Sequence, residues 1–467
     1  MFSRSRAWAG ARGLAATLAL AVSLVALSSP ASAGPRPPGG ALADPVVRAV
    51  DVAEPAVVRI ATLYQGTITL RLCGVSVTLP EAGLPYTVGA LGSGAFISAH
   101  GDVLTAEHVV DVPPQDLEQA IFQNSRAAAD IAAVVNSAPC LRLTAPLTPD
   151  DVTAGALPAL GIATATQFGD PSIQVWRGTG FMGVSAAGPD SNSLSQALFD
   201  APHQTASVEV SSVFQQDDVA ILHVGLDDTP SIQLDQATSV APQDHLTIIG
   251  FPGNGDLDPL LGGGLSDNLL TPSVNIVNVS AIKHNRNGSL LIQVGGNVEH
   301  GDSGGPALDS EGRIVGIVSF GGPDSRGETA FLRSSDSVQA LITRGSLDTR
   351  PGQFQQKWAH AFGVYAASYA GHWHAAAAEL DALAGQYPDF QAIGPYRVFA
   401  DTAASHETAT TATQVLSLPI LLAAAGVVVV VLVVLSIVAV ARARSRRKAR
   451  QRAVAEAATP PTPAVPV

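Results

Sequence analysis

Residues 301–306 form a short glycine-rich run around one serine: Gly301-Asp302-Ser303-Gly304-Gly305-Pro306. A serine hydroxyl is a poor nucleophile unless a tight turn holds it beside a base. The flanking glycines allow such a turn and let a substrate carbonyl approach the backbone. The turn also directs the N–H groups of Gly301 and Ser303 into one small space, where they can stabilise a developing oxyanion. The run therefore predicts an acyl-transfer nucleophile, and the alternative is a glycine-rich turn without chemistry.

The run closely resembles the nucleophile motif of chymotrypsin-fold serine proteases, whose triad follows the chain order His, Asp, Ser. In that comparison His108 is indicated as the general base, because Thr-Ala-Glu-His-Val-Val follows a Gly-Ser-Gly strand at the spacing of this fold. Among the eleven histidines of the chain, His100 is a rival, but it lies in the turn before the strand that leads to His108. His300 lies beside the serine turn, where we expect it to line the substrate cleft.

Two neighbouring carboxylates compete for the third position of the triad. Asp217 and Asp218 both precede the apolar run 219–222. The resembling proteases place the acid directly before such a run, and strand alternation would turn Asp217 to the other face. We therefore predict that Asp218 orients His108, which takes the proton of Ser303.

Further segments resemble the HtrA-type bacterial serine proteases, and together they cover about residues 45–345. The resemblance implies an all-β protease domain with two antiparallel six-stranded β-barrels and an active site between them. It also implies that proteins or peptides are hydrolysed through an acyl-enzyme, with Gly301 and Ser303 as the oxyanion hole and with no cofactor or metal. We expect no PDZ-like domain after the protease domain, although many HtrA-type enzymes have one.

The same resemblance gives an outline of the substrate pocket. Asn297, six residues before the serine, falls at the base of the primary pocket. Ser319, Phe320 and Gly321 would form one wall. Asn297 carries no charge, so the pattern does not support a preference for Lys or Arg at the cleaved position.

An insertion is predicted between the base and the acid, because 110 residues separate His108 from Asp218. It would occupy about 111–210, as a lid, an exosite or a decorated loop. The two cysteines of the chain are Cys73 and Cys140. In an oxidising compartment they would form one disulfide that ties the first barrel to the insertion, and two separate thiols are the alternative.

Both ends of the chain indicate export and anchoring. Residues 1–33 have a basic start, an apolar run and a small-residue cleavage site, which is typical of a signal peptide. Residues 415–440 contain no charged residue and are long enough to cross a bilayer. The tail 441–467 carries seven basic residues, which favours a cytoplasmic position. The linker 406–414 precedes the span, and residues 352–405 show helical spacing that weakly resembles a tetratricopeptide-like pair.

The charge of the chain argues against nucleic acid as a partner. The whole sequence carries 26 basic and 39 acidic residues, a net charge of −13. Without the three basic residues of the leader and the seven basic and one acidic residues of the tail, 16 basic and 38 acidic residues remain, a net charge of −22. An exported part this acidic disfavours binding to nucleic acid or to anionic lipid.

The sequence therefore predicts a serine endopeptidase anchored in the cell membrane by one helix, with its protease domain outside the cytoplasm. Its partners would be protein or peptide substrates and the lipid bilayer. The alternative is a protease-fold binding or sensor module that is catalytically idle or gated by a ligand.

Overall fold

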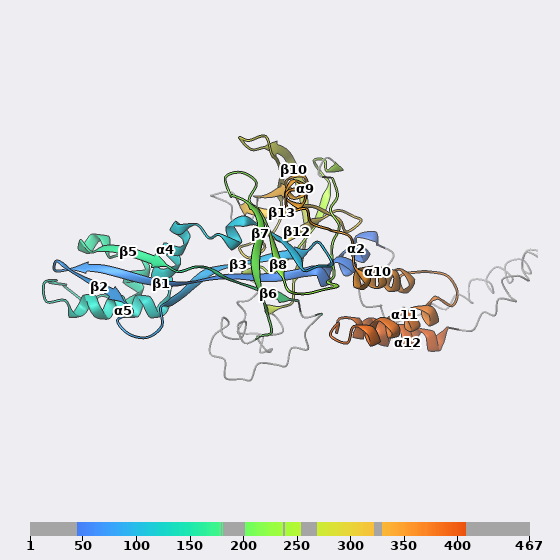
Figure 1. The fold of residues 1–467 in the computed structure, drawn as a ribbon, viewed down its shortest axis with the longest axis horizontal. Helices are drawn as coiled ribbons and strands as arrows, with labels where there is room; N and C mark the ends of the chain where they lie inside the picture. The colour runs from blue at the N-terminus through green and yellow to red at the C-terminus, as the bar shows by residue number, and fades with distance from the viewer. Residues whose placement is uncertain are drawn as a thin grey trace, which may run out of the picture.

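The computed structural model describes residues 44–178, 180, 201–236, 239–253, 269–321 and 329–407. Two antiparallel β-barrels form the middle of the molecule, an arm of strands and helices extends from one side, and three helices lie on the other (Figure 1). The predicted signal peptide 1–33, the span 415–440 and the tail 441–467 lie outside the described residues. Within the described ranges, no helix combines the length and the apolar character that a bilayer crossing requires.

The first barrel is built from six strands, and its closing contact is made by one long strand. Its members are β1 (Val57–Leu72), β3 (Tyr86–Phe96), β4 (Asp102–Thr105), β6 (Ser172–Arg177), β7 (Gln204–Ser212) and β8 (Val219–Val224). The pairing order is β1-β3-β4-β8-β7-β6, and β6 pairs back with β1. Inward positions are occupied by Val, Ile, Leu and Phe side chains, as the half-buried strands of a small barrel require.

The second barrel is also closed and has six strands. Its members are β9 (His245–Gly250), β10 (Ser273–His284), β11 (Leu290–Gly295), β12 (Pro306–Leu308), β13 (Ile314–Gly321) and β14 (Thr329–Ser334). They pair in the order β10-β11-β14-β13-β12-β9, and β9 pairs with β10. The expectation of two antiparallel six-stranded barrels is confirmed.

The arm begins where the paired strands β1 and β3 extend beyond the first barrel. The outer half of β1 pairs with β2 (Val75–Leu79) and with β5 (Ala163–Phe168). Helices α4 (Pro114–Gln123), α5 (Ser125–Ser137) and α6 (Pro149–Thr153) and the turn η2 (Pro158–Leu160) cover this sheet. A separate hydrophobic core fills the space between them. The arm is therefore a folded unit rather than an open loop.

The insertion is shorter than the predicted range 111–210. Residues 111–168 belong to the arm, but β6 and β7 complete the first barrel. The prediction placed these two strands in the insertion because their sequence, with its many Ser and Gln residues, gives a weak strand signal. The connection of residues 181–200 between them lies outside the described residues.

The two cysteines form one disulfide, which lies within the arm and does not tie the first barrel to the insertion as predicted. Cys73, in the β1–β2 turn, is bonded to Cys140, which follows α5, and their Cα atoms are 5.8 Å apart. The bond closes a loop with a sequence separation of 67 residues inside the arm. A cross-link of this span removes much conformational freedom from the unfolded chain.

We expect the double variant Cys73→Ser and Cys140→Ser to lose stability in the arm, by about 2–4 kcal/mol. Limited proteolysis in urea should cut residues 111–168 at a lower urea concentration than in the wild type. Dithiothreitol should reproduce the effect in the wild type and leave the variant unchanged. Equal cleavage profiles would contradict a stabilising role.

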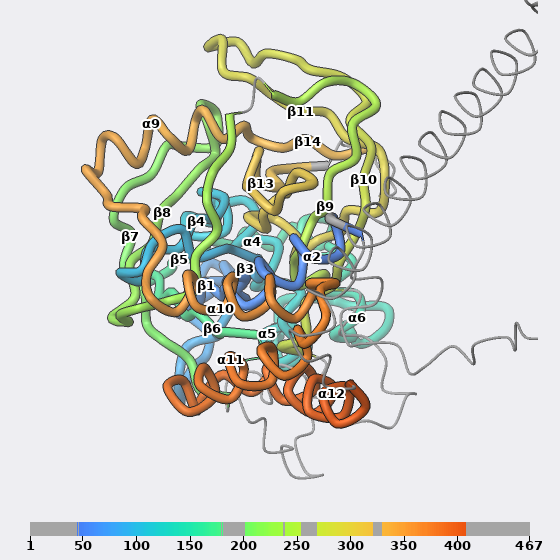
Figure 2. Tube along the Cα trace, turned by 90° about the vertical axis from the view of Figure 1, so that its right-hand side faces the viewer, coloured from blue at the N-terminus to red at the C-terminus, as the bar shows by residue number. Residues whose placement is uncertain are grey.

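Helices at both ends pack against the barrels. α2 (Pro45–Ala53) and η1 (Glu54–Ala56) lead into β1, and α9 (Ser335–Gly345) follows β14. α10 (Gln353–Tyr365), α11 (His372–Gln386) and α12 (Ile393–His406) form the helical segment expected over 352–405, with a core of aromatic side chains. Figure 2 shows these three helices together on one side, with α10 near α2. Asp228, in the loop after β8, links α10 and the end of α11 to the first barrel. Its carboxylate accepts hydrogen bonds from Phe354 N at 2.9 Å and from Tyr387 Oη at 2.6 Å.

Candidate active site

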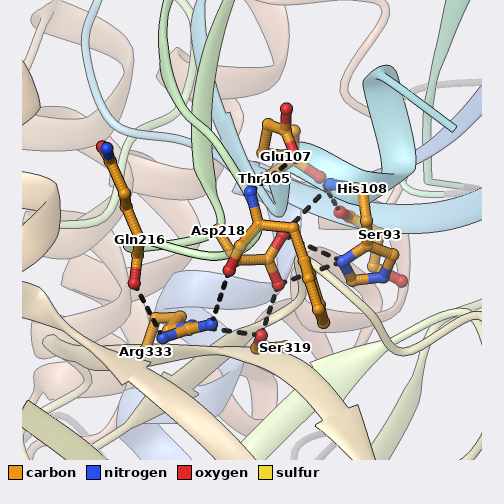
Figure 3. Close-up of polar contacts among 9 residues, drawn as sticks. Ser93, Thr105, Glu107, His108, Gln216, Asp218, Ser319 and Arg333 are labelled. Carbon is orange, nitrogen blue, oxygen red and sulfur yellow. Dashed lines mark hydrogen bonds and ion pairs between the residues drawn. The ribbon is translucent and has the colours of Figure 1, made fainter. Parts of the chain in front are cut away.

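The predicted base and acid meet because their strands are paired. His108 lies on the short helix α3 (Glu107–Val110), which directly follows β4, and Asp218 directly precedes β8. β4 and β8 are antiparallel neighbours, with Thr105 opposite Ala220. The end of one strand therefore lies beside the start of the other. His108 Nδ1 is 3.0 Å from each carboxylate oxygen of Asp218 (Figure 3).

Asp218 is fully buried and is held by three partners. Besides the imidazole, the backbone N–H of His108 donates to its Oδ1 at 3.0 Å, and the hydroxyl of Ser319 donates to its Oδ2. A carboxylate only accepts hydrogen bonds, so Nδ1 of His108 carries a proton here. This leaves Nε2 free to accept one. Asp218 has a left-handed backbone with φ of 49°, which costs about 1–2 kcal/mol for most L-residues and is best tolerated by Asn and Asp.

Asp217, the competing carboxylate, faces other groups. Its oxygens accept hydrogen bonds from Ser212 Oγ and Ser337 Oγ, each at 3.1 Å. Burial raises the pKa of Asp217, but its hydrogen bonds with serines and the charge of Arg333 outweigh this effect, so the pKa lies below its ordinary value. The structure thus brings Asp218, and not Asp217, to the imidazole.

The serine turn connects β11 to β12 and depends on its glycines. Gly301 has φ of 103° and Gly304 has φ of 83°. A Cβ atom on Gly304 would lie 2.2 Å from Thr105 Oγ1 and 2.3 Å from the carbonyl oxygen of Ser93. Only glycine fits this position, because both its backbone angle and the space exclude a side chain.

The turn packs directly against the segment that carries the histidine. Gly304 approaches Thr105 and Ala106, which immediately precede α3. A Cβ on Gly92 would meet both Val109 of α3 and the carbonyl oxygen of Ser303. Ser303, half-buried, and His108 are therefore held on adjoining surfaces of the two barrels.

Ser93 joins these parts, and the sequence interpretation did not single it out. Its N–H donates to Ser303 O at 2.8 Å, and its hydroxyl donates to Gly301 O at 2.7 Å. The same hydroxyl accepts from Phe251 N at 2.8 Å, and the carbonyl oxygen of Ser93 accepts from Thr105 Oγ1 at 2.8 Å. The Gly-Ser-Gly pattern at 92–94 was a usable signal, since a serine between two strand glycines leaves room for close backbone contacts.

We expect Ser93→Ala to destabilise the protein by about 1–3 kcal/mol, because Phe251 N–H and Gly301 C=O would lose a buried partner. The serine turn would also be less firmly held, so labelling of Ser303 by a fluorophosphonate should slow. Urea unfolding and the labelling rate measure the two effects. Ser137→Ala, an exposed serine of the arm, is the control that should change neither.

The backbone of the serine turn has two N–H groups without an acceptor in the described residues. The carbonyl of His300 accepts a hydrogen bond from Gly253 N at 2.7 Å. In a trans peptide the C=O and N–H point in opposite directions, so the N–H of Gly301 points away from Gly253. Within the described part of the chain, the N–H groups of Gly301 and Ser303 have no protein acceptor. This arrangement fits an oxyanion hole that is already formed.

Two further carboxylates in the site have shifted pKa values. Burial, with the nearby charges of Asp111 and Asp218, raises the pKa of Glu107 to about 7, although Phe214 N donates to it at 3.0 Å. Burial also raises the pKa of Asp302 to about 6, although Glu299 N donates to its Oδ2 at 3.0 Å. Both groups therefore bind a proton more readily than an exposed carboxylate does.

The residues predicted to bind substrate are placed with less definition. Asn297 and His300 are exposed, and Phe320 is half-buried. The side chain of Ser319 is buried against Asp218 rather than facing a pocket. Gly321 pairs with Ala330 at the end of β13. Their roles in specificity stay predictions.

Within the described residues, no group of three His, Cys, Asp or Glu side chains is placed to hold a metal ion.

Comparisons with known proteins agree with this geometry. Residues 92–317 match the family model of the trypsin-like peptidase domain. No curated protein matches the chain. Among solved structures, the HtrA-type protease AlgW with a decapeptide is 19% identical with a TM-score of 0.34, and the match covers 64% of this chain and 68% of that one. A serine endoprotease from Yersinia pestis is 17% identical with a TM-score of 0.33, covering 65% and 68%.

Both TM-scores are below 0.5, so the assignment rests on the family match and on the two barrels. The matched range contains the serine turn, the histidine helix and both candidate acids. The chain is thus a serine peptidase with a trypsin-like peptidase domain.

Proposed function

We propose that the protein is a membrane-anchored serine endopeptidase that works outside the cytoplasm, with His108, Asp218 and Ser303 as its triad. The observation that carries the proposal is the contact of His108 Nδ1 with both oxygens of buried Asp218, beside the glycine turn of Ser303. This contact sets the tautomer in which Nε2 can accept a proton.

The proposed reaction follows from these positions. His108 Nε2 takes the proton of Ser303 as its Oγ attacks the carbonyl carbon of a peptide bond. The N–H groups of Gly301 and Ser303 stabilise the oxyanion of the tetrahedral intermediate. His108 then gives the proton to the leaving amine, and the acyl-enzyme forms. A water molecule, activated by the same imidazole, releases the acid product and restores Ser303.

Two observations bear on whether the site is gated or idle. The His300 carbonyl is bound to Gly253 N, which keeps that oxygen out of the space where an oxyanion would lie. Asp218 is satisfied by three donors, and two of them belong to His108. Both support an active protease over an idle binding module.

The anchoring part of the proposal comes from the sequence. Residues 1–33 would direct export, 415–440 would span the membrane and 441–467 would stay in the cytoplasm. Protein or peptide substrates would then be cleaved outside the cytoplasm, near the surface of the membrane that holds the anchor. We expect detergent to release the full chain from membranes, and we expect high salt or carbonate not to release it. Release by salt alone would overturn the anchor.

The decisive test of the activity is labelling of the full chain with a fluorophosphonate, beside Ser303→Ala. This reagent reacts only with a serine that is activated by a base and an oxyanion hole. We expect the wild type to be labelled and Ser303→Ala to be unlabelled. Cleavage of a peptide library should follow the same pattern. A folded wild type that neither reacts with the probe nor cleaves peptides would overturn the proposal.

A further inference from the structure

A buried arginine lies behind the candidate acid. Arg333, on β14, has only 4% of its surface exposed. Its Nε donates to Ser319 Oγ at 3.3 Å, and the same hydroxyl donates to Asp218 (Figure 3). The guanidinium is therefore separated from the carboxylate of Asp218 by a single hydroxyl group.

The other two nitrogens of this guanidinium hold the loop that carries the acid. Arg333 Nη1 donates to the carbonyl of Gln216 at 3.1 Å, and Nη2 donates to the carbonyl of Phe214 at 3.0 Å. Asp218, two residues further on, has a left-handed backbone. Such a conformation persists only where the surroundings determine it. The planar fork of an arginine can make these three directed bonds at once, whereas a lysine cannot.

Arg333 also contacts the strand that is predicted to bind substrate. Its Cζ lies 5.6 Å from the ring centre of Phe320. The Phe320 ring contacts that of Phe214 edge-on at 6.0 Å, and Phe214 in turn contacts the His108 imidazole at 5.8 Å. One side chain thus packs against the acid loop, the hydroxyl partner of the acid and the expected wall of the substrate pocket.

We infer that Arg333 is a positioning residue, which fixes Asp218 and the imidazole of His108 in reactive geometry through Ser319 and through the carbonyls of Phe214 and Gln216. The inference rests on the proposed function and adds a residue to it. The hydrogen bonds of Arg333 in the described residues go to Ser319, Gln216 and Phe214, and not to His108 or Ser303.

A positioning role predicts an effect that a loss of stability alone would not produce. Without the three hydrogen bonds from Arg333, the loop of Asp218 would be held less firmly, and the hydrogen bond between His108 Nδ1 and the carboxylate would weaken. The loss should therefore appear in the reactivity of Ser303, and in kcat rather than in KM.

The test compares Arg333→Met, Arg333→Lys and the wild type as full chains in detergent. The ¹H resonance of the His108 Nδ1–H group, which His108→Ala assigns, reports its hydrogen bond to Asp218. The rate of fluorophosphonate labelling reports the reactivity of Ser303. We expect Arg333→Met to label about 10²-fold more slowly, with its loss in peptide cleavage mainly in kcat, and with a shifted or broadened Nδ1–H resonance. Arg333→Lys keeps the charge without the fork, so its labelling should also be slowed.

Arg344→Met removes an exposed arginine at the end of α9 and is the matched control, which should behave as the wild type. Folded Arg333→Met protein with the wild-type labelling rate and the wild-type Nδ1–H resonance would overturn the inference. If no variant labels, including the wild type, the proposed activity fails, and the resonance alone decides the inference. An unchanged Nδ1–H resonance in Arg333→Met overturns it, and a shifted or broadened one supports it.

Discussion

Asp218→Asn is expected to lower kcat by about 10⁴-fold with little change in the fold. The carboxylate accepts hydrogen bonds from His108 Nδ1, His108 N and Ser319 Oγ. An amide has one acceptor oxygen and an NH₂ group that only donates, so it cannot satisfy all of these donors. The imidazole then prefers the tautomer with its proton on Nε2, which cannot accept the proton of Ser303. Peptide cleavage and the fluorophosphonate labelling rate both measure the loss.

The neighbouring carboxylate provides the control for this prediction. Asp217 is bonded to Ser212 and Ser337 and does not contact the imidazole. Asp217→Asn should therefore keep most of the activity, with at most a modest loss of stability. If instead Asp217→Asn abolished labelling and Asp218→Asn did not, the assignment of the acid would be wrong.

Asp302→Asn is expected to stabilise the protein at neutral pH by up to about 3 kcal/mol. Asp302 is fully buried beside the nucleophile, and its Oδ1 has no hydrogen-bond partner in the described residues. Burial raises its pKa from 3.8 to about 6. One pKa unit corresponds to about 1.4 kcal/mol, so a rise of about two units disfavours the ionised form in the folded state by about 3 kcal/mol.

The pH dependence follows from the direction of the shift. The raised pKa means that the folded state holds its proton more tightly than the unfolded chain does. The related stability is fully present below about pH 4 and is lost as the pH rises through about 6. The gain from Asp302→Asn should therefore be small near pH 4 and largest above pH 7.

Urea unfolding at a series of pH values measures this gain. Asp170 is exposed and lies between β5 and β6, so Asp170→Asn should show no such dependence and serves as the control. Equal stability of Asp302→Asn and the wild type at pH 8 would show that the buried carboxylate has a partner there. Such a result would remove the basis of the prediction.

The chemistry of the site was largely predictable from local patterns. The run 301–306 predicted a tight nucleophile turn, and the structure shows glycine at two positions where the backbone or the space excludes a side chain. The resemblance to serine proteases, which includes the order of His108, Asp218 and Ser303, implied two barrels. The same resemblance, together with strand alternation, favoured Asp218 over Asp217.

The arm and the barrel boundary were not predictable in the same way. β6 and β7 are rich in Ser, Thr and Gln, and their place in the first barrel depends on pairing with β1 and β8, which lie far away in the sequence. A local pattern cannot tell such strands from a polar insertion, because the hydrogen bonds that define them are made with distant partners. Ser319 was placed in a pocket wall for the same reason, since its contact with Asp218 spans 101 residues.

The sequence by itself thus determined the nucleophile turn, the likeness to a serine protease, the two cysteines of the arm and the expected export and anchoring. Tertiary structure alone decided which side chains hold these parts in place. Ser93 joins both barrels to the serine turn, and Arg333 joins the acid loop to β13. Arg333 has no sequence signature and Ser93 has only its two flanking glycines, because the function of a buried polar side chain lies in the partners that folding brings to it.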